Sequence, residues 1–184
     1  VWTERPALVH QPADVLKDEF NGEATASKLA RVREQMEKEE AQYHIISTLD
    51  DIAWILNVRG NDIPHVPVVL SFLVIGKENA MWFVEENALS DAVKEMAAEC
   101  GVTVRPYEDV YAYAATIPEH SSVLLDKRKV NYRITNALSE TVHIVSKANP
   151  SQLMKAIKNE IELENTRKAH LLDGIAVTKF MYWL

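Results

Sequence analysis

The sequence has one cysteine, five glycines and no long apolar run. Cys100 alone cannot form an intramolecular disulfide, which rules out a disulfide scaffold and favours a reducing compartment. No apolar run approaches the roughly 20 residues that a membrane-spanning helix needs, so we expect no membrane partner. Five glycines leave little material for a phosphate cradle, and no GxGxxG, P-loop or GxSxG pattern is present. Catalysis by this chain alone is therefore not supported.

The charges and histidines also lack the patterns of known binding sites. The net charge is -7, and Lys and Arg are interspersed with Asp and Glu, so we expect no nucleic-acid partner. No two histidines have metal-ligand spacing, and we predict no metal ligand and no catalytic residue in this chain. His44 and His143 lie in expected strands, where a hydrogen-bonded structural role is the better interpretation. The others are His10, His65, His120 and His170.

Hydrophobic periodicity predicts an α/β domain. Residues 25–41 repeat apolar side chains at spacings of three and four, and their charged residues, Lys28 among them, are expected to face solvent. Residues 68–75 are almost entirely apolar and precede a strand at 80–84, which predicts a hairpin. Further helices are expected at 52–56, 89–99, 108–116 and 130–140, and further strands at 43–48, 102–107, 122–126 and 142–146. This order predicts a mixed sheet of about six strands with helices on the outside.

Three segments are expected along the chain. Residues 1–23 have little periodicity and are interpreted as an extended linker from a preceding domain. Residues 24–150 form the α/β domain, and residues 151–184 form the first helices of a following domain. An exposed apolar end would be an aggregation hazard, so we expect this chain to be part of a longer protein. The apolar residues that recur there are Ala169, Leu172, Ala176, Phe180 and Trp183.

Two adjacent carboxylates, Asp50 and Asp51, precede the helix expected at 52–56. A carboxylate pair is compatible with acid–base chemistry, but neighbours at i and i+1 point to different sides of a helix. The positive end of a helix favours carboxylates at its start. We therefore interpret both residues as helix-cap residues. Trp54, in the same helix, is expected to pack in the core.

The turn at Arg59, Gly60, Asn61 and Asp62 has two interpretations. Gly60 supplies backbone freedom, and Asn61 and Asp62 are turn formers, so a purely structural turn explains the sequence. Alternatively, Arg59, Asp62 and His65 face a neighbouring domain or a bound peptide, because polar loops on rigid scaffolds often carry function. The structural interpretation is preferred. These three residues are the one candidate contact site that we retain.

A resemblance to a known family lies in residues 49–75, LDDIAWILNVRGNDIPHVPVVLSFLVI. This stretch resembles the middle domain of the cytosolic, eukaryotic-type aminopeptidase P family, also called X-Pro aminopeptidase. Residues 155–184, KAIKNEIELENTRKAHLLDGIAVTKFMYWL, are similar to the first helices of that family's catalytic domain. Residues 1–6, VWTERP, are similar to the junction between its first and middle domains. The three matches keep the family's order, so the resemblance covers almost the whole chain.

The resemblance implies a parent protein with two creatinase-type α/β domains and a pita-bread metallopeptidase domain. The implied reaction releases the N-terminal residue of an X-Pro peptide, with two divalent metals, typically manganese, activating a water molecule. The implied Asp, Asp, His, Glu and Glu ligands belong to the pita-bread domain, so none is assigned here and we expect this chain to be noncatalytic. The implied partners are the first and catalytic domains, the peptide and a second copy in a homodimer, and the implied location is cytoplasmic.

Two alternatives stay open. The chain could belong to a pita-bread-type pseudoenzyme and serve as a peptide-binding or assembly module. Loss of the five metal ligands from the downstream sequence would favour that alternative, and their retention would favour the enzyme. A creatinase or prolidase relative is less favoured, because the RGNDIP stretch and the linker resemble the three-domain form.

Overall fold

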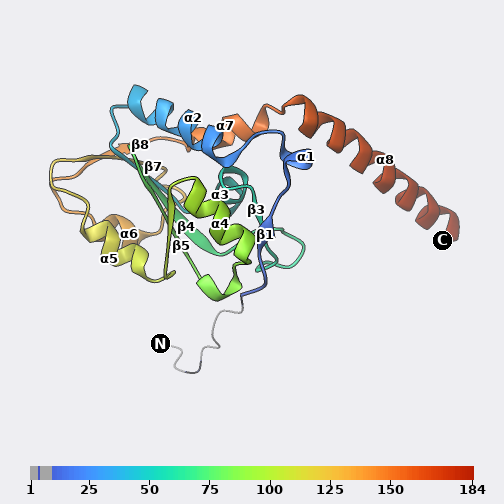
Figure 1. Ribbon diagram of the computed structural model, residues 1–184, viewed down its shortest axis with the longest axis horizontal. Coiled ribbons are helices and arrows are strands. Elements are labelled where there is room, and N and C mark those ends of the chain that lie inside the picture. Colours follow the sequence, from blue (N-terminus) through green and yellow to red (C-terminus); the bar gives the residue numbers. More distant parts are fainter. Residues whose placement is uncertain (1–3, 5–9) are drawn as a thin grey trace.

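A six-stranded mixed sheet forms the centre of the computed structural model, which describes residue 4 and residues 10–184 (Figure 1). Its strands are β2 (Tyr43–Ile46), β4 (Ser71–Gly76), β5 (Ala80–Val84), β6 (Val102–Arg105), β7 (Ser122–Leu125) and β8 (His143–Ser146). The strand order is β6-β5-β4-β2-β7-β8. β4 is antiparallel to β2 and β5, whereas the other neighbours are parallel. The predicted mixed sheet with a hairpin is confirmed.

Helices cover both faces of this sheet. The helices on one face are α2 (Thr25–Lys38), α3 (Leu49–Ile55) and α4 (Asp91–Glu99), and those on the other are α5 (Asp109–Ala115) and α6 (Tyr132–Ala137). Successive side chains of β4 alternate between the two cores: Leu73 joins the first and Phe72 the second. Because both faces are covered, all of β4 is buried, as its uninterrupted apolar sequence predicts.

The described part of the predicted linker packs against the domain. β1 (Asp14–Val15) pairs antiparallel with β3 (Val58–Arg59), and α1 (Asp18–Asn21) follows it. Ala13 is only 2% exposed, because it joins the core. The expectation of a wholly extended segment is therefore wrong for this part, since elements this short leave no periodicity in the sequence. The predicted junction motif at 1–6 lies, except for one residue, outside the described part of the chain.

Two helices follow the sheet, α7 (Pro150–Ala156) and α8 (Glu160–Trp183), and the remaining short element is a 3-10 turn, η1 (Glu86–Ala88). α8 has 24 residues and is about 36 Å long. Its beginning lies against α1, and Figure 1 shows the rest projecting away from the domain. Across residues 10–184, no helix combines the length and apolar composition that crossing a membrane requires.

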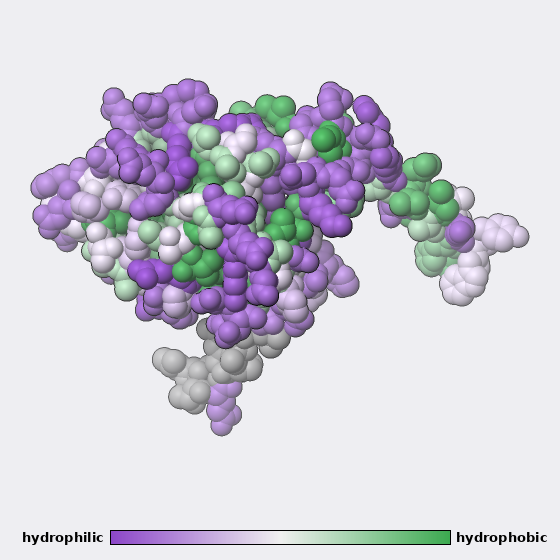
Figure 2. All heavy atoms as spheres, viewed as in Figure 1, coloured by the Kyte–Doolittle hydropathy of each residue, from purple (hydrophilic) through white to green (hydrophobic). Residues whose placement is uncertain are grey.

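The outer half of α8 exposes large apolar side chains, which Figure 2 shows on the projecting part of the molecule. The predicted helical character of this segment is confirmed. Its assignment to a following domain stays a prediction. The most exposed large apolar side chains of this half and of the residue after it belong to Leu172, Met181, Tyr182, Trp183 and Leu184.

Candidate functional site

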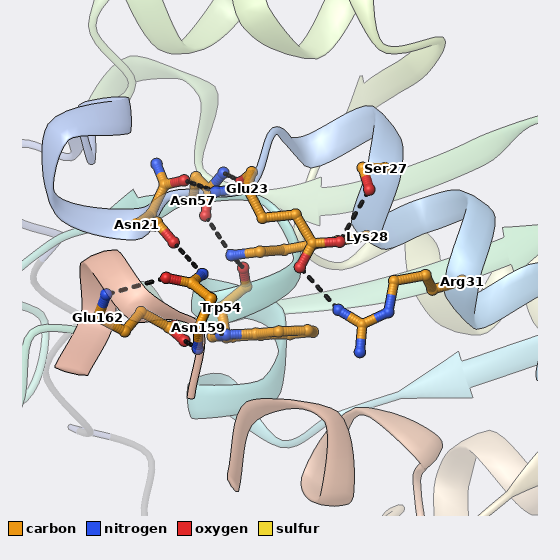
Figure 3. A network of polar contacts seen from close by, with 9 residues as sticks. All are labelled: Asn21, Glu23, Ser27, Lys28, Arg31, Trp54, Asn57, Asn159 and Glu162. Carbon is orange, nitrogen blue, oxygen red and sulfur yellow. Dashed lines mark hydrogen bonds and ion pairs between the residues drawn. The ribbon is translucent and has the colours of Figure 1, made fainter. Parts of the chain in front are cut away.

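A network of polar contacts holds the start of α8 against the domain (Figure 3). α8 begins with a capping box, because Asn159 and Glu162 are three residues apart. The Glu162 amide donates to Asn159 Oδ1 at 2.9 Å, and the Asn159 amide donates to Glu162 Oε2 at 3.0 Å. Two backbone donors that the helix leaves unpaired are thereby satisfied. Its first turn is therefore well defined.

α1 provides one wall of this junction. Asn159 Nδ2 donates to the backbone oxygen of Asn21 at 2.8 Å, and Asn165 Nδ2 donates to that of Glu19 at 2.8 Å. Gly22 ends α1 in the left-handed conformation, with φ of 65°, which permits the tight turn into α2. The two asparagines therefore bond carbonyl oxygens at the end of α1 that lack helical partners.

Lys28 and Trp54 form the buried centre of the junction. The Lys28 ammonium donates to the Trp54 backbone oxygen at 3.0 Å and to Asn57 Oδ1 at 2.7 Å. It also lies 4.3 Å from the centroid of the Trp54 ring, within cation–π range. The Trp54 indole N–H in turn donates to Glu162 Oε1 at 3.4 Å. One aromatic ring thus connects α2 to α8.

Glu23 surrounds this centre with a second layer of contacts. Its backbone oxygen accepts from Asn57 Nδ2 at 2.8 Å, and its carboxylate accepts from Arg31 at 2.7 Å and from Ser27 at 2.8 Å. Asn57 itself has a φ of 53° and is buried. Asparagine tolerates that conformation better than most residues. The contacts tie α2, α3 and the loop before α2 into one unit.

Burial lowers the pKa of Lys28 from its ordinary 10.5 to about 8, although the carboxylates of Glu162 and Glu23 partly oppose this shift. In the unfolded chain the side chain keeps its proton until about pH 10.5. Between these two values the unfolded state binds more protons, so stability rises with pH. The folded domain therefore becomes easier to form as Lys28 loses its charge.

Lys28→Met is expected to remove this pH dependence. Relative to the variant, the wild type should gain on the order of 3 kcal/mol of unfolding free energy between about pH 7 and pH 11. Urea denaturation followed by circular dichroism at several pH values measures the difference. Subtracting the unfolding free energy of the variant from that of the wild type cancels the contributions of Tyr113 and Cys100, whose pKa values burial raises. Parallel pH profiles for the two proteins would contradict the expectation.

Gly22→Ala is expected to lower the free energy of unfolding by about 2 kcal/mol. The positive φ is strained for alanine, and its Cβ would lie 2.7 Å from Asn159 Oδ1 and 2.9 Å from Ile161 Cβ. Gly101→Ala is the matched control, because Gly101 has φ of 68° but nothing within 4 Å. Gly101→Ala should lower the free energy of unfolding by about 1 kcal/mol, from backbone strain alone. Equal losses in urea denaturation would show that contact with α8 is unimportant.

A second set of polar contacts fixes α7. Lys155 Nζ lies 2.7 Å from Asp51 Oδ1 and also pairs with Asp50. The Asp51 side chain is fully buried and accepts further hydrogen bonds from Thr48 and from Asn149 Nδ2, the latter at 3.0 Å. Burial alone would lower the pKa of Lys155, but its bonds to Asp50 and Asp51 raise it. The ammonium therefore stays charged in the folded protein.

This arrangement adds a second role to Asp50 and Asp51, which were interpreted as helix-cap residues. Both lie in the first turn of α3, as expected, but the Thr48 side chain that precedes them makes no capping bond to the backbone. The two carboxylates reach one ammonium because the Lys155 side chain is long enough to lie between them. Their role is to join α3 to α7, which sequence neighbours could not reveal.

The three candidate contact residues, Arg59, Asp62 and His65, have different environments in the structure. Arg59 Nη1 donates to the backbone oxygens of Ala53 at 2.7 Å and Val58 at 3.0 Å. The buried Asp62 carboxylate accepts from the amides of Gln11 and Leu70, each at 2.7 Å. His65 is exposed, with φ of 66°. Arg59 and Asp62 thus have structural partners, and their role in contact with another domain stays a prediction.

Lys28 is the residue whose position sequence reasoning placed wrongly. It was expected on the solvent face, yet it is 1% exposed. A signal existed: Lys28 stands four residues before Val32 and beside Leu29, on the apolar stripe of α2. Its partners Trp54 and Asn57 come from elements distant in sequence, so their acceptor groups could not be foreseen. The correction moves Lys28 from a charged surface to the centre of the junction.

The histidine expectation holds for His44, which lies in β2 with no exposed surface. Its Nδ1 is 2.9 Å from the backbone oxygen of Leu124, and burial lowers its pKa to about 4. His143 lies in β8, as predicted, but it is exposed, so its expected hydrogen-bonded structural role is not confirmed. Within the described residues, no group of three or more His, Cys, Asp or Glu side chains could hold a metal ion.

Trp54 and Cys100 have the structural positions expected of them. Trp54 is 8% exposed and belongs to the core, in agreement with the prediction. Cys100 ends α4 just before Gly101, whose positive φ the sequence pattern anticipated.

Comparison with known proteins shows similarity along the whole chain. Residues 4–162 match the family model described as Creatinase/Prolidase N-terminal domain. Probable Xaa-Pro aminopeptidase P of Sordaria macrospora is 36% identical, in an alignment covering 100% of this chain and 32% of the relative. Xaa-Pro aminopeptidase 1 of Dictyostelium discoideum is 35% identical, covering 92% of this chain and 27% of the relative. The chain therefore spans about a third or less of the length of these relatives.

Two solved structures share the fold. X-prolyl aminopeptidase from Caenorhabditis elegans, described as a cytosolic enzyme with a di-nuclear active site, has a TM-score of 0.89 and 29% identity. The match covers 100% of this chain and 31% of that one. The prolidase from Pyrococcus horikoshii OT3 has a TM-score of 0.56 and 20% identity, covering 82% of this chain and 41% of that one, and shows the fold alone. The chain belongs to the creatinase/prolidase N-terminal domain family, and it corresponds to the N-terminal domain region of Xaa-Pro aminopeptidase-type proteins.

Proposed function

We propose that this chain is a noncatalytic middle domain that positions the catalytic domain of a metal-dependent X-Pro aminopeptidase. The observation that carries the proposal is the construction of α8. Its start is held by a capping box and by bonds to α1 and Trp54, while its outer half exposes apolar side chains. A helix held at one end and apolar at the other is suited to carry a second folded unit in a defined direction.

The proposed parent reaction is the release of the N-terminal residue from a peptide whose second residue is proline. Two divalent metals, with manganese as the proposed ion, would supply the activated water in the catalytic domain. The di-nuclear active site of the similar enzyme from Caenorhabditis elegans supports the number of metal ions, whereas manganese comes from the family resemblance alone. The described residues here contain no suitable metal-binding group, so no catalytic step is assigned to them.

The proposed partners are a first domain, the catalytic domain, the X-Pro peptide and a second copy in a homodimer. A cytoplasmic location is proposed by analogy with the cytosolic relative. For the turn residues, we keep contact with another domain as a proposal, with His65 the best placed because it is exposed. Arg59 and Asp62 would act indirectly, by holding the turn in shape.

A chimaera tests the proposed function. The matching segment of the Caenorhabditis elegans enzyme is replaced by this chain, and hydrolysis of an X-Pro peptide is measured with manganese. The chimaera should retain metal-dependent activity, and Trp54→Ala within it should lower kcat. Surface variant Lys94→Ala serves as the control, because Lys94 lies on α4, away from α8. Full activity of the Trp54→Ala chimaera would contradict the positioning role.

The isolated chain provides a complementary measurement. We expect it neither to cleave an X-Pro peptide nor to bind manganese tightly. Turnover that persists through purification to homogeneity would show that catalytic groups lie within the chain. Specific binding of the uncleaved peptide, detected by NMR chemical shifts, would instead favour a peptide-binding module.

A further inference from the structure

We propose that the charge of Lys28 controls how firmly the start of α8 is held, so that the junction is a proton-sensitive latch on the direction of this helix. The inference rests on the proposed function, because it adds regulation to the junction that positions α8. The latch consists of Lys28, Trp54 and Glu162, one residue each from α2, α3 and α8 (Figure 3).

The geometry connects these three residues in series. The ammonium of Lys28 lies over the Trp54 ring, 4.3 Å from its centroid. The indole N–H of Trp54 points to Glu162 Oε1 at 3.4 Å, and Glu162 caps α8 through the Asn159 amide. A cation over the ring withdraws electron density and makes the indole N–H a stronger donor. The charge of Lys28 thereby strengthens the bond that holds the capping residue of α8.

Four other charged groups act on Lys28. Glu162 on α8 and Glu23 before α2 attract the ammonium, whereas Arg59 on β3 and Arg31 on α2 repel it. Glu162 makes the largest contribution among these charges, and it alone belongs to α8. Displacement of α8 therefore removes the main attraction and leaves both arginines in place. By linkage, α8 is held more tightly when Lys28 is protonated.

The sign of this effect differs from that of overall stability. Unfolding returns Lys28 to water, so the whole domain gains stability when the buried ammonium loses its proton. Displacement of α8 alone leaves Lys28 covered by α2, by the Trp54 ring and by Asn57. Because these contacts are kept, we infer that the attraction to Glu162 changes more than the desolvation of Lys28 and decides the outcome. As the pH rises through about 8, α8 should loosen while the domain becomes more stable.

Distance measurements between spin labels test the latch in the whole chain. Labels are placed by Lys38→Cys at the end of α2 and Lys179→Cys on the outer part of α8, in a Cys100→Ser background. Distance distributions are recorded at about pH 6.5 and about pH 9.5, on either side of the Lys28 pKa. We expect the displaced population of α8 to rise about tenfold between them, a change that corresponds to about 1.4 kcal/mol.

Two variants separate the latch from other causes. Lys28→Met is neutral at every pH and should give the broad distribution in both conditions. Glu162→Gln keeps an acceptor for the Trp54 N–H but removes the charge that attracts Lys28, so its distribution should respond to pH much less than that of the wild type. A wild-type distribution that is unchanged between the two conditions overturns the proposal. A response to pH in Glu162→Gln that is as large as that of the wild type also overturns the proposal. This second variant decides the question if Lys28→Met does not fold.

These readouts require no peptidase activity. Failure of the latch would leave α8 rigidly held at every pH, and the positioning role would stand. Failure of the chimaera would instead remove the proposed parent reaction, while the dependence of α8 on Lys28 would still be measurable. The failure of one proposal can therefore be distinguished from the failure of the other.

Discussion

Trp54→Ala is expected to lower the free energy of unfolding by about 3–5 kcal/mol. The indole ring is 8% exposed and lies in the main core, so its removal leaves a large cavity. The change also uncovers the ammonium of Lys28, which lies over the ring, and removes a partner of Glu162. Urea denaturation followed by circular dichroism measures the loss. Few single substitutions in this chain should cost as much.

Trp54→Phe is the matched control. Phenylalanine keeps an aromatic face for Lys28 and most of the packing, but it cannot donate to Glu162. We expect a loss of about 1 kcal/mol, typical of a single hydrogen bond together with a small change in volume. If both variants lost the same stability, the indole N–H rather than the buried ring would be the main contribution.

Asp51→Ala is expected to destabilise the fold by about 3 kcal/mol, the lower end of the range for a broken buried ion pair. The Asp51 side chain is fully buried and bonds Lys155, Thr48 and Asn149. Removal of the carboxylate leaves the ammonium with Asp50 alone and leaves donors without their acceptor. Because Lys155 is partly exposed, water relieves some of this cost. Equilibrium unfolding in urea again provides the measurement.

Asp50→Ala tests whether burial decides this effect. Asp50 is adjacent in sequence and pairs with the same Lys155, but its side chain is 64% exposed. Exposed ion pairs contribute about 0–1 kcal/mol, so the expected loss is below about 1 kcal/mol. Comparable losses for the two aspartates would mean that the ion pair acts through its charge and not through its buried hydrogen bonds.

The architecture could be predicted because its signals are local. The apolar run that becomes β4 and the strand that becomes β5 are separated by a short turn, so their pairing follows from sequence order. The helices α2 and α4 have apolar residues at spacings of three and four. Covering both faces of the sheet is then the arrangement that buries these apolar residues.

The junction could not be predicted in the same way. Lys28 donates to Asn57, 29 residues away, and Trp54 donates to Glu162, 108 residues away. Each of these side chains has an ordinary local interpretation as a surface charge, a core aromatic, a turn residue or a cap. The capping box of α8 was readable in principle, since Asn159 and Glu162 have the required spacing. The contact of Glu162 with Trp54 could not be predicted from the sequence.

The sequence by itself determined the α/β class, the order of the elements and the family resemblance, because periodicity and motifs depend on residues close together along the chain. The tertiary structure decided which polar residues are buried and what they contact. Lys28 became a buried cation and Asp51 a buried ion-pair partner only when α3, α7 and α8 came together. The physical reason is that desolvation and hydrogen bonding depend on neighbours in space, which a linear pattern does not contain.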